Sequence, residues 1–238
     1  MTGALCTGLA AGLAGCGTDD PDAGTNGVGK LDPAGIQSRT VKAAQGADAV
    51  HVAGTVVSGG KTYKLDMRLK DEGGSGSVTS GSSTFRLLRV GTHLYLKADA
   101  DFWTHSDEAK SGSGHGDGAA ADKLDGKYVK VPTGDPAYQR LSTFTDKDVL
   151  LDGLLTLHGS LDKGDHGSSG GVRTIGLTGD DGAGGTLDVS LEGTPYPMRL
   201  ERAGGAGTLQ LTDWGRTFTL QEPDVDDTVD YGKALPAS

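Results

Sequence analysis

Thr62-Tyr63-Lys64-Leu65-Asp66-Met67-Arg68-Leu69-Lys70 is the segment of this sequence that decides the fold. Its odd-numbered residues are aromatic or aliphatic, whereas its even-numbered residues are polar or charged. A hydrophobic period of two indicates a β-strand. Because one face is apolar and the other is charged, we expect this strand in a sheet that packs on the protein core with one face and is exposed to solvent on the other.

The segments on both sides of this strand continue the pattern and are separated by short, glycine-rich turns such as Gly59-Gly60 and Gly91-Thr92. Since each strand follows the previous one through a short connection, we expect antiparallel pairing. A glycine-rich turn is expected at 164–171. The expected strands span 50–57, 62–70, 85–90, 93–98, 127–131, 172–178, 186–191, 197–202, 208–211 and 216–221, with a weaker strand around Val78.

Three segments carry helix signals. Asp32-Pro33 and Asp135-Pro136 each place an N-cap residue before a proline at the first helical position. A third helix, capped by Thr145 or Asp146, has leucines at helical spacing and is expected to end at Gly159.

The order of elements predicts the fold class. An antiparallel sheet with one apolar face must curl or be covered, and the helical segments lie between the two groups of strands. We therefore expect an α+β fold: a single curved antiparallel sheet, or half-barrel, wrapped around a few helices with an apolar space between them. Residues 32–223 form one domain in this prediction, because neither half has enough apolar residues to stand alone.

The N-terminal segment from Ala4 to Gly15 is apolar, but it is shorter than the roughly 20 residues that a membrane-spanning helix needs. It has the character of a signal peptide (residues 1–15). Since the first basic residue is Lys30, we expect the basic start of that signal to lie upstream of Met1. An acidic, glycine-rich stretch follows and is interpreted as a flexible tether (16–31).

Leu13-Ala14-Gly15-Cys16 resembles the lipobox of bacterial lipoproteins, [LV]-[AS]-[GA]-C. The resemblance implies lipidation of the Cys16 thiol, cleavage before Cys16, and a lipid anchor on the extracytoplasmic face of the cell membrane. Cys6 would leave with the signal peptide, so the mature chain would have no disulfide.

The composition excludes several functional classes. The formal net charge of −10 argues against a nucleic-acid partner and against electrostatic docking on anionic lipid; the lipid on Cys16 must therefore supply the membrane attachment. With 41 glycines and only 5% aromatic residues, the chain must form its core through regular alternation along strands. The segment 224–238 is interpreted as a solvated acidic tail.

No catalytic residue, cofactor or metal site is predicted. Gly167-Ser168-Ser169-Gly170-Gly171 fits the G-x-S-x-G pattern, but a nucleophile elbow needs a strand before it and a helix after it. Here a polar turn precedes Ser169, a strand follows it, and no histidine lies beyond His166. The histidines occur singly, without the paired spacing of a zinc site; His105 and His115 share only an acidic loop.

The chain also resembles the actinobacterial LppX/LprG-type lipoproteins, which are similar in shape to the LolA and LolB lipoprotein carriers. The resemblance covers nearly the whole mature chain. It depends on the order of four segments: the lipobox at Cys16, 92–103, 124–132 and 196–215. It implies a half-barrel whose concave face and helices enclose a cavity for the acyl chains of lipids or glycolipids, which are carried without chemical change.

Ten apolar residues are the candidates for lining that cavity: Tyr63, Leu65, Met67, Phe85, Leu87, Leu94, Leu96, Leu150, Leu151 and Leu154. They would pack together as an ordinary core whether or not a ligand enters. Two hypotheses therefore stay open. The first is an anchored lipoprotein that binds or carries acylated lipid or glycolipid; the second is a non-enzymatic scaffold or regulatory lipoprotein with a collapsed cavity that recruits an envelope protein.

Overall fold

The computed structural model describes residues 20–103 and 117–230, and its strands form one sheet of twelve. The strand order is β12-β6-β5-β4-β3-β2-β1-β11-β10-β9-β8-β7. The strands are β1 (Ala49–Ser58), β2 (Lys61–Lys70), β3 (Gly73–Ser80), β4 (Ser83–Val90), β5 (His93–Ala98), β6 (Tyr128–Val131), β7 (Leu161–Ser169), β8 (Val172–Gly179), β9 (Thr186–Ser190), β10 (Pro197–Glu201), β11 (Thr208–Thr212) and β12 (Thr228–Asp230). The helices are α1 (Pro33–Gln45), α3 (Asp117–Leu124), α4 (Pro136–Ser142) and α5 (Lys147–Leu155).

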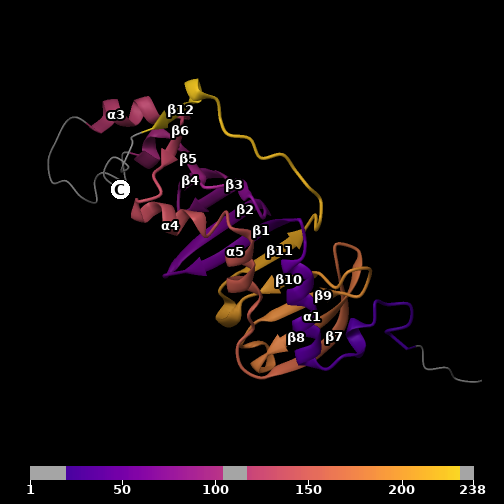
Figure 1. Ribbon diagram of the computed structural model, residues 1–238. Helices are drawn as coiled ribbons and strands as arrows, with labels where there is room; N and C mark the ends of the chain where they lie inside the picture. The colour runs from indigo at the N-terminus through magenta and orange to yellow at the C-terminus, as the bar shows by residue number, and fades with distance from the viewer. Residues whose placement is uncertain (1–19, 104–116, 231–238) are drawn as a thin grey trace, which may run out of the picture.

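Strand β1 joins the two halves of the sheet. It pairs antiparallel with β2 over its whole length and with β11 on its other edge. Figure 1 shows β2–β6 and β12 above this junction and β7–β11 below it. All other neighbours are also antiparallel except β12 and β6, which run parallel. The predicted α+β fold with a single curved, mainly antiparallel sheet is confirmed.

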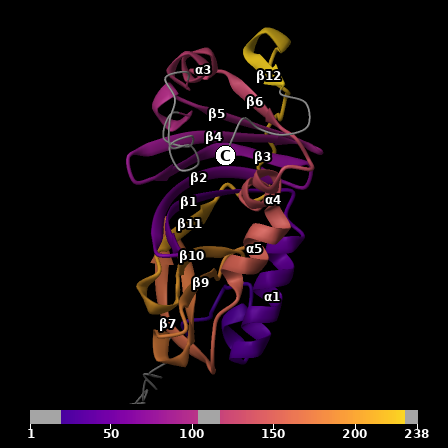
Figure 2. The ribbon, with the colours of Figure 1, turned by 90° about the vertical axis from the view of Figure 1, so that its left-hand side faces the viewer.

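The helices α1, α4 and α5 lie on the concave face of this sheet (Figure 2). Asp32, Asp135 and Asp146 cap them, each accepting a hydrogen bond from a main-chain N–H of the first turn. Helix α5 ends at Leu155 and not at Gly159, because the main-chain N–H of His158 donates to Gly184 O (3.0 Å), which draws the chain toward the loop before β9.

The alternation in β2 is as predicted: Leu65, Met67 and Leu69 are at most 1% exposed and face the helices. Next to them, Gly76 of β3 allows a close approach between strands. A Cβ atom at Gly76 would lie 2.0 Å from Asp66 O and 2.7 Å from Met67 Cα. Part of the high glycine content thus permits tight strand packing in the curved sheet.

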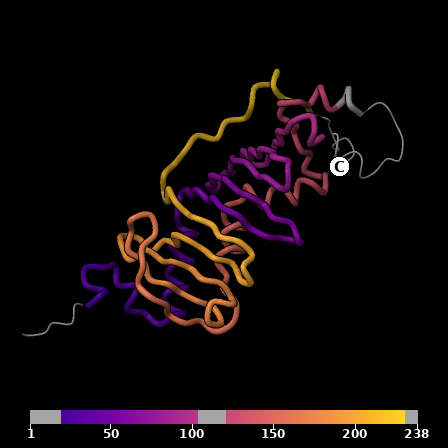
Figure 3. Tube along the Cα trace, turned by 180° about the vertical axis from the view of Figure 1, so that it is seen from behind, coloured from indigo at the N-terminus to yellow at the C-terminus, as the bar shows by residue number. Residues whose placement is uncertain are grey.

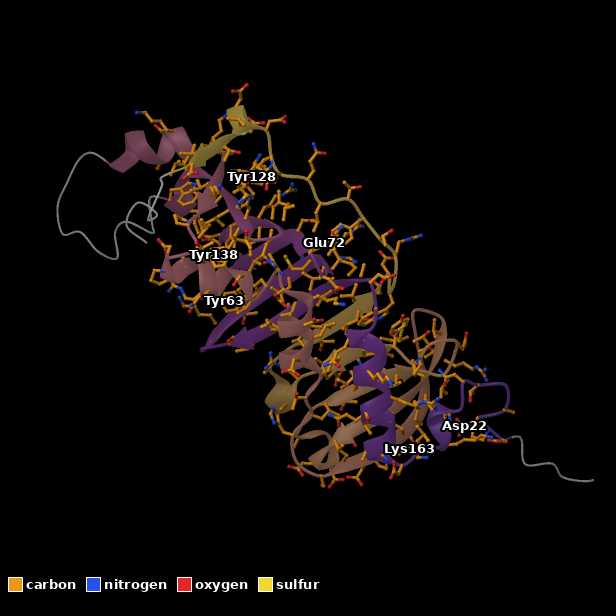
Figure 4. The ribbon with its side chains drawn as sticks, viewed as in Figure 1. Asp22, Tyr63, Glu72, Tyr128, Tyr138 and Lys163 are labelled. Atoms are coloured by element: carbon orange, nitrogen blue, oxygen red, sulfur yellow. The ribbon has the colours of Figure 1, made fainter. Side chains whose placement is uncertain are left out.

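Residues 20–31 do not form the expected tether. Val28 is fully buried, Asn26 Nδ2 donates to Ser190 O (2.9 Å), and Lys163 Nζ donates to Gly29 O (2.8 Å). Asp22 meets His166 at 3.1 Å; Figure 4 shows Asp22 and Lys163 together at this end of the sheet. This part of the chain completes the core at β7 and β8, which the sequence analysis overlooked.

Two other predictions are wrong. Residues 164–169, expected in a turn, belong to strand β7, which has an irregular register between Lys163 and His166. Residues 216–221, expected as a strand, are part of an extended segment that we call the strap (residues 213–227). Figures 1 and 3 show the strap leaving β11 and running along the sheet to β12. Because Thr228–Asp230 pairs with β6, this part of the expected acidic tail is also ordered in the sheet.

The strap is fastened to the outer face of the sheet at β5. Glu222 Oε1 lies 2.6 Å from His93 Nδ1, and the Tyr95 hydroxyl donates to Glu222 Oε2 at 3.0 Å. These hydrogen bonds lower the pKa of the Glu222 carboxyl. Burial, followed by the contact with Glu222, raises the pKa of Tyr95 to about 12.

A buried lysine links three elements on the concave side. The Lys147 side chain is 2% exposed, and its Nζ donates to Ala47 O (2.6 Å) and Gln45 O (3.2 Å), just past the end of α1. The same ammonium lies 2.7 Å from an Asp71 carboxylate in the β2–β3 turn. A cation beside the C-terminus of a helix also complements the helix dipole. Lys147 thus fixes α5 to α1 and to the sheet.

We predict that Lys147→Met lowers the free energy of unfolding by about 1–3 kcal/mol, because the hydrogen bonds to the Gln45 and Ala47 carbonyls are lost at a buried site. Lys42→Met is the matched control: Lys42 is an exposed lysine of α1, and its loss should change stability by less than about 0.5 kcal/mol. Urea unfolding measures both. A Lys147→Met protein as stable as the parent would contradict the assigned link.

A second prediction concerns the strap. A tyrosine with a raised pKa contributes stability that is complete below pH 10 and disappears as the pH rises toward 12, whereas the lowered pKa of Glu222 gives stability that is lost in acid. Phenolate absorbance at 295 nm should show one tyrosine titrating near pH 12. In Glu222→Gln this titration should shift downward but stay above pH 10, because burial is the larger cause. In the control Glu192→Gln it should be unchanged, and an equal shift in both variants would contradict the contact.

Candidate functional site

The candidate site is the apolar interior between the inner face of β2–β6 and helices α4 and α5. The strand register brings the predicted side chains into one lattice. Leu87 lies opposite Leu96, Leu96 lies opposite Val129, and Phe85 and Leu65 both pair with Val78. Residues at alternate positions of antiparallel strands share one face, so these side chains form a continuous apolar surface.

The ten predicted lining residues do meet in space. Seven of them are at most 5% exposed and belong to one hydrophobic cluster, and the other three are partly buried and pack against it. The buried seven are Leu65, Met67, Leu87, Leu94, Leu96, Leu151 and Leu154; the partly buried three are Tyr63, Phe85 and Leu150. All ten thus belong to or pack against one hydrophobic core, in which Leu154 also borders the small hollow beside β10.

One end of this interior is closed by a polar contact, close to the point where the strap is attached to the opposite face of the sheet. Arg89 shares the inner face of β4 with Phe85 and Leu87, and its side chain is 12% exposed. Its guanidinium donates to Thr145 O (2.9 Å), Thr145 Oγ1 (3.2 Å) and Asp146 Oδ2 (3.2 Å) between α4 and α5. The interior is therefore closed at this end. Sequence analysis missed this contact, although an arginine at an inward position of a strand was a usable signal.

The opposite end of the interior has four partly buried aromatic side chains and the buried Trp103. The ring centroids of Tyr63 and Phe144 lie 6.2 Å apart, those of Phe85 and Phe102 lie 5.4 Å apart, and Trp103 meets Phe102 edge-on at 5.2 Å. Figure 4 shows Tyr63 on the side of the sheet that the helices cover and Tyr128 on the other side. We call Tyr63, Phe85, Phe102, Trp103 and Phe144 the aromatic rim.

Trp103 adds one polar atom to the aromatic rim. The residue is 7% exposed, and its indole Nε1 is buried without a hydrogen-bond partner among the residues that the structure describes. A buried donor without a partner is costly. The rim therefore offers one donor to a polar group that enters beside the apolar interior.

A small hollow lies at the end of α5, beside β10 and the loop before β9, and outside the interior that faces β2–β6. The hollow that Leu154 borders, between α5 and β10, has a volume of about 50 Å³. That is less than two water molecules occupy in liquid water.

The remaining sequence-based site predictions have mixed outcomes. Cys16, His105 and His115 lie outside the described residues. Ser169 ends strand β7, and β8 follows after a two-residue turn, so the strand–turn–helix of a nucleophile elbow is not formed there. Its hydroxyl lies 3.4 Å from Gln210 Oε1. Within residues 20–103 and 117–230, every helix is too short or too polar to span a bilayer.

Comparison with known proteins supports the architecture. The sequence matches no protein-family model and no curated protein. The structure is similar to that of LprF from Mycobacterium bovis, with a TM-score of 0.51 and 16% identity over 80% of this chain and 96% of LprF. It also matches the lipoprotein LppX from Mycobacterium tuberculosis over 80% of this chain and all of LppX, with a TM-score of 0.46 and 18% identity. The chain therefore has the half-barrel fold of LprF, as the resemblance to LppX/LprG-type lipoproteins implied.

Proposed function

We propose that this protein is a lipid-anchored, extracytoplasmic lipoprotein that binds or carries an acylated lipid or glycolipid between its sheet and its helices, without chemistry on the lipid. The observation that carries the proposal is the continuous apolar inner face of β2–β6, which is closed by Arg89 at one end and bounded by the aromatic rim at the other. Burying an acyl chain there would contribute about 0.8 kcal/mol per methylene group.

Entry of the lipid takes place at the aromatic rim in this proposal. The Tyr63–Phe144 contact links β2 to the segment between α4 and α5, so its opening would separate the helices from the sheet at that end. Arg89 and Lys147 would hold the other end in place. The indole N–H of Trp103 is available for an ester carbonyl or a hydroxyl of the headgroup region.

A second candidate function is a scaffold or regulatory lipoprotein that recruits an envelope protein. The burial of seven of the ten lining residues in one hydrophobic cluster favours it, because side chains that pack on one another need no ligand. The two candidates differ in one respect that can be measured: the first requires that lipid enters, and the second requires that the interior stays closed.

Native mass spectrometry of the unlipidated Cys16→Ser chain, purified from a phospholipid-rich host, distinguishes them. We expect an adduct of lipid mass that is lost on denaturation. Tyr63→Glu, which places a charge at the aromatic rim, should remove the adduct, whereas Thr62→Glu, the same change on the outer face of β2, should keep it. An apo protein that takes up no added lipid would support the scaffold.

Anchoring is tested separately. We expect the parent chain, expressed behind a lipoprotein signal sequence, to sediment with membranes, and the Cys16→Ser chain to be recovered in the soluble fraction, because a thioether-linked lipid would be the attachment. Cell fractionation followed by immunoblotting measures this. A Cys16→Ser protein that still sediments with membranes would contradict the proposed anchor.

A further inference from the structure

The outer face of the sheet, opposite the helices, contains a hollow with a volume of about 580 Å³. It lies over the middle of β2, β3 and β4 and reaches β6. The side chains that matter for its chemistry are Arg68, Ser75, Ser77, Arg86 and Tyr128. The hollow lies on the opposite side of the sheet from the apolar interior. Binding of a ligand here therefore does not depend on whether a lipid binds in the interior.

The strand register explains the shape of this hollow. On β3, Ser75 lies opposite Arg68 of β2, and Ser77 lies opposite Arg86 of β4. The short side chains of Ser75 and Ser77 form a floor, and the arginines stand on the strands at either side. Strands β2 and β4 are about 10 Å apart, since each neighbour is separated by about 4.8 Å. Two arginine side chains are long enough to reach one group held between them.

The cations of this hollow outnumber its acids, since Arg68 and Arg86 line it together with a single carboxylate, that of Asp66. Neither Arg68 nor Arg86 has an ion pair or a side-chain hydrogen bond within the described part of the chain, and the hydroxyls of Ser75, Ser77 and Tyr128 have no hydrogen-bond partner there. The acid in the hollow, Asp66, is bonded to His51 Nε2 at 2.8 Å. Two guanidinium groups and three hydroxyls are thus free to contact a ligand.

One cross-strand pair is unfavourable without a ligand. Arg86 lies directly opposite Lys97 on β5, and like charges in that position destabilise a sheet. Lys97 Nζ is 4.9 Å from the centroid of the Tyr128 ring, so this charge remains beside the hollow. The chain has a net charge of −10, yet cations predominate in and beside this hollow.

We propose that this hollow binds the phosphate group of a small phosphorylated polyol. Guanidinium groups bind phosphate oxygens through paired, charge-assisted hydrogen bonds, and the serine and tyrosine hydroxyls can bond to the hydroxyls of the polyol. The volume falls within the roughly 300–1,000 Å³ of small-molecule sites. The concave shape and the net charge of −10 favour a single anionic group over a flat anionic membrane.

Isothermal titration calorimetry on the detergent-solubilised full chain tests this site, with myo-inositol 1-phosphate as the probe. We expect saturable binding that weakens with salt, whereas neutral myo-inositol should not bind. Arg68→Gln and Arg86→Gln should each weaken binding about tenfold, because each removes hydrogen bonds to a charged group. Arg39→Gln is the matched control, since Arg39 is an exposed arginine of α1 without a partner in the described residues, and it should leave the affinity unchanged.

Thermal unfolding of each variant shows whether weaker binding is caused by a loss of stability. Arg86→Gln removes the like-charge contact with Lys97, so this variant should be at least as stable as the parent while binding more weakly. Absence of binding to the parent chain would overturn the proposal, as would equal affinity in all variants. Binding of the chain's outer face to phosphatidylinositol vesicles but not to the free compound would replace it with a membrane contact.

Discussion

The apolar inner face of the sheet is the constraint on which the rest of the structure depends. A sheet with alternate strand positions occupied by Leu, Met and Val must bury that face, and here helices α1, α4 and α5 cover it. Hydrophobic contact alone does not fix where helices lie, because it has no direction. Hydrogen bonds, which are directional, fix the position of helix α5. Arg89 bonds the start of α5 to β4, and Lys147 bonds the start of α5 to the end of α1.

The two faces of the sheet therefore differ in chemistry as well as in burial. Side chains of β2 illustrate this, since Leu65 and Met67 point to the helices while Asp66 and Arg68 point outward. In the outer-face hollow, Arg68 and Arg86 have no bonded partner within the described part of the chain, whereas Arg89 and Lys147 on the inner side each form several bonds. A cation that is bonded in the core serves the fold, and an unpaired cation in a hollow remains available to a ligand.

Sequence reasoning succeeded where the local pattern and the long-range environment agree. The alternation of β2 and the Asp-Pro helix starts are local, and both are found in the structure. Residues 216–221 also alternate, but β11 before them is paired on both edges, with β1 and β10, so no neighbouring edge is free. Conversely, the glycine-rich segment 161–169 became a strand because β8 had a free edge. Edge availability depends on the whole topology and cannot be seen in a window of sequence.

Local periodicity was enough to predict the ten lining residues, but it could not show whether they bind a lipid or only pack as a core. Periodicity identifies the inner face, but a packed core and a lipid-binding interior require the same apolar residues. The difference lies in how firmly the helices are held. The bonds of Arg89 and Lys147 are concentrated at one end of the interior, and the aromatic contacts Tyr63–Phe144 and Phe85–Phe102 join the other end. Aromatic contacts tolerate sliding and reorientation better than buried ion pairs do. An interior held in this uneven way would open at the aromatic rim first.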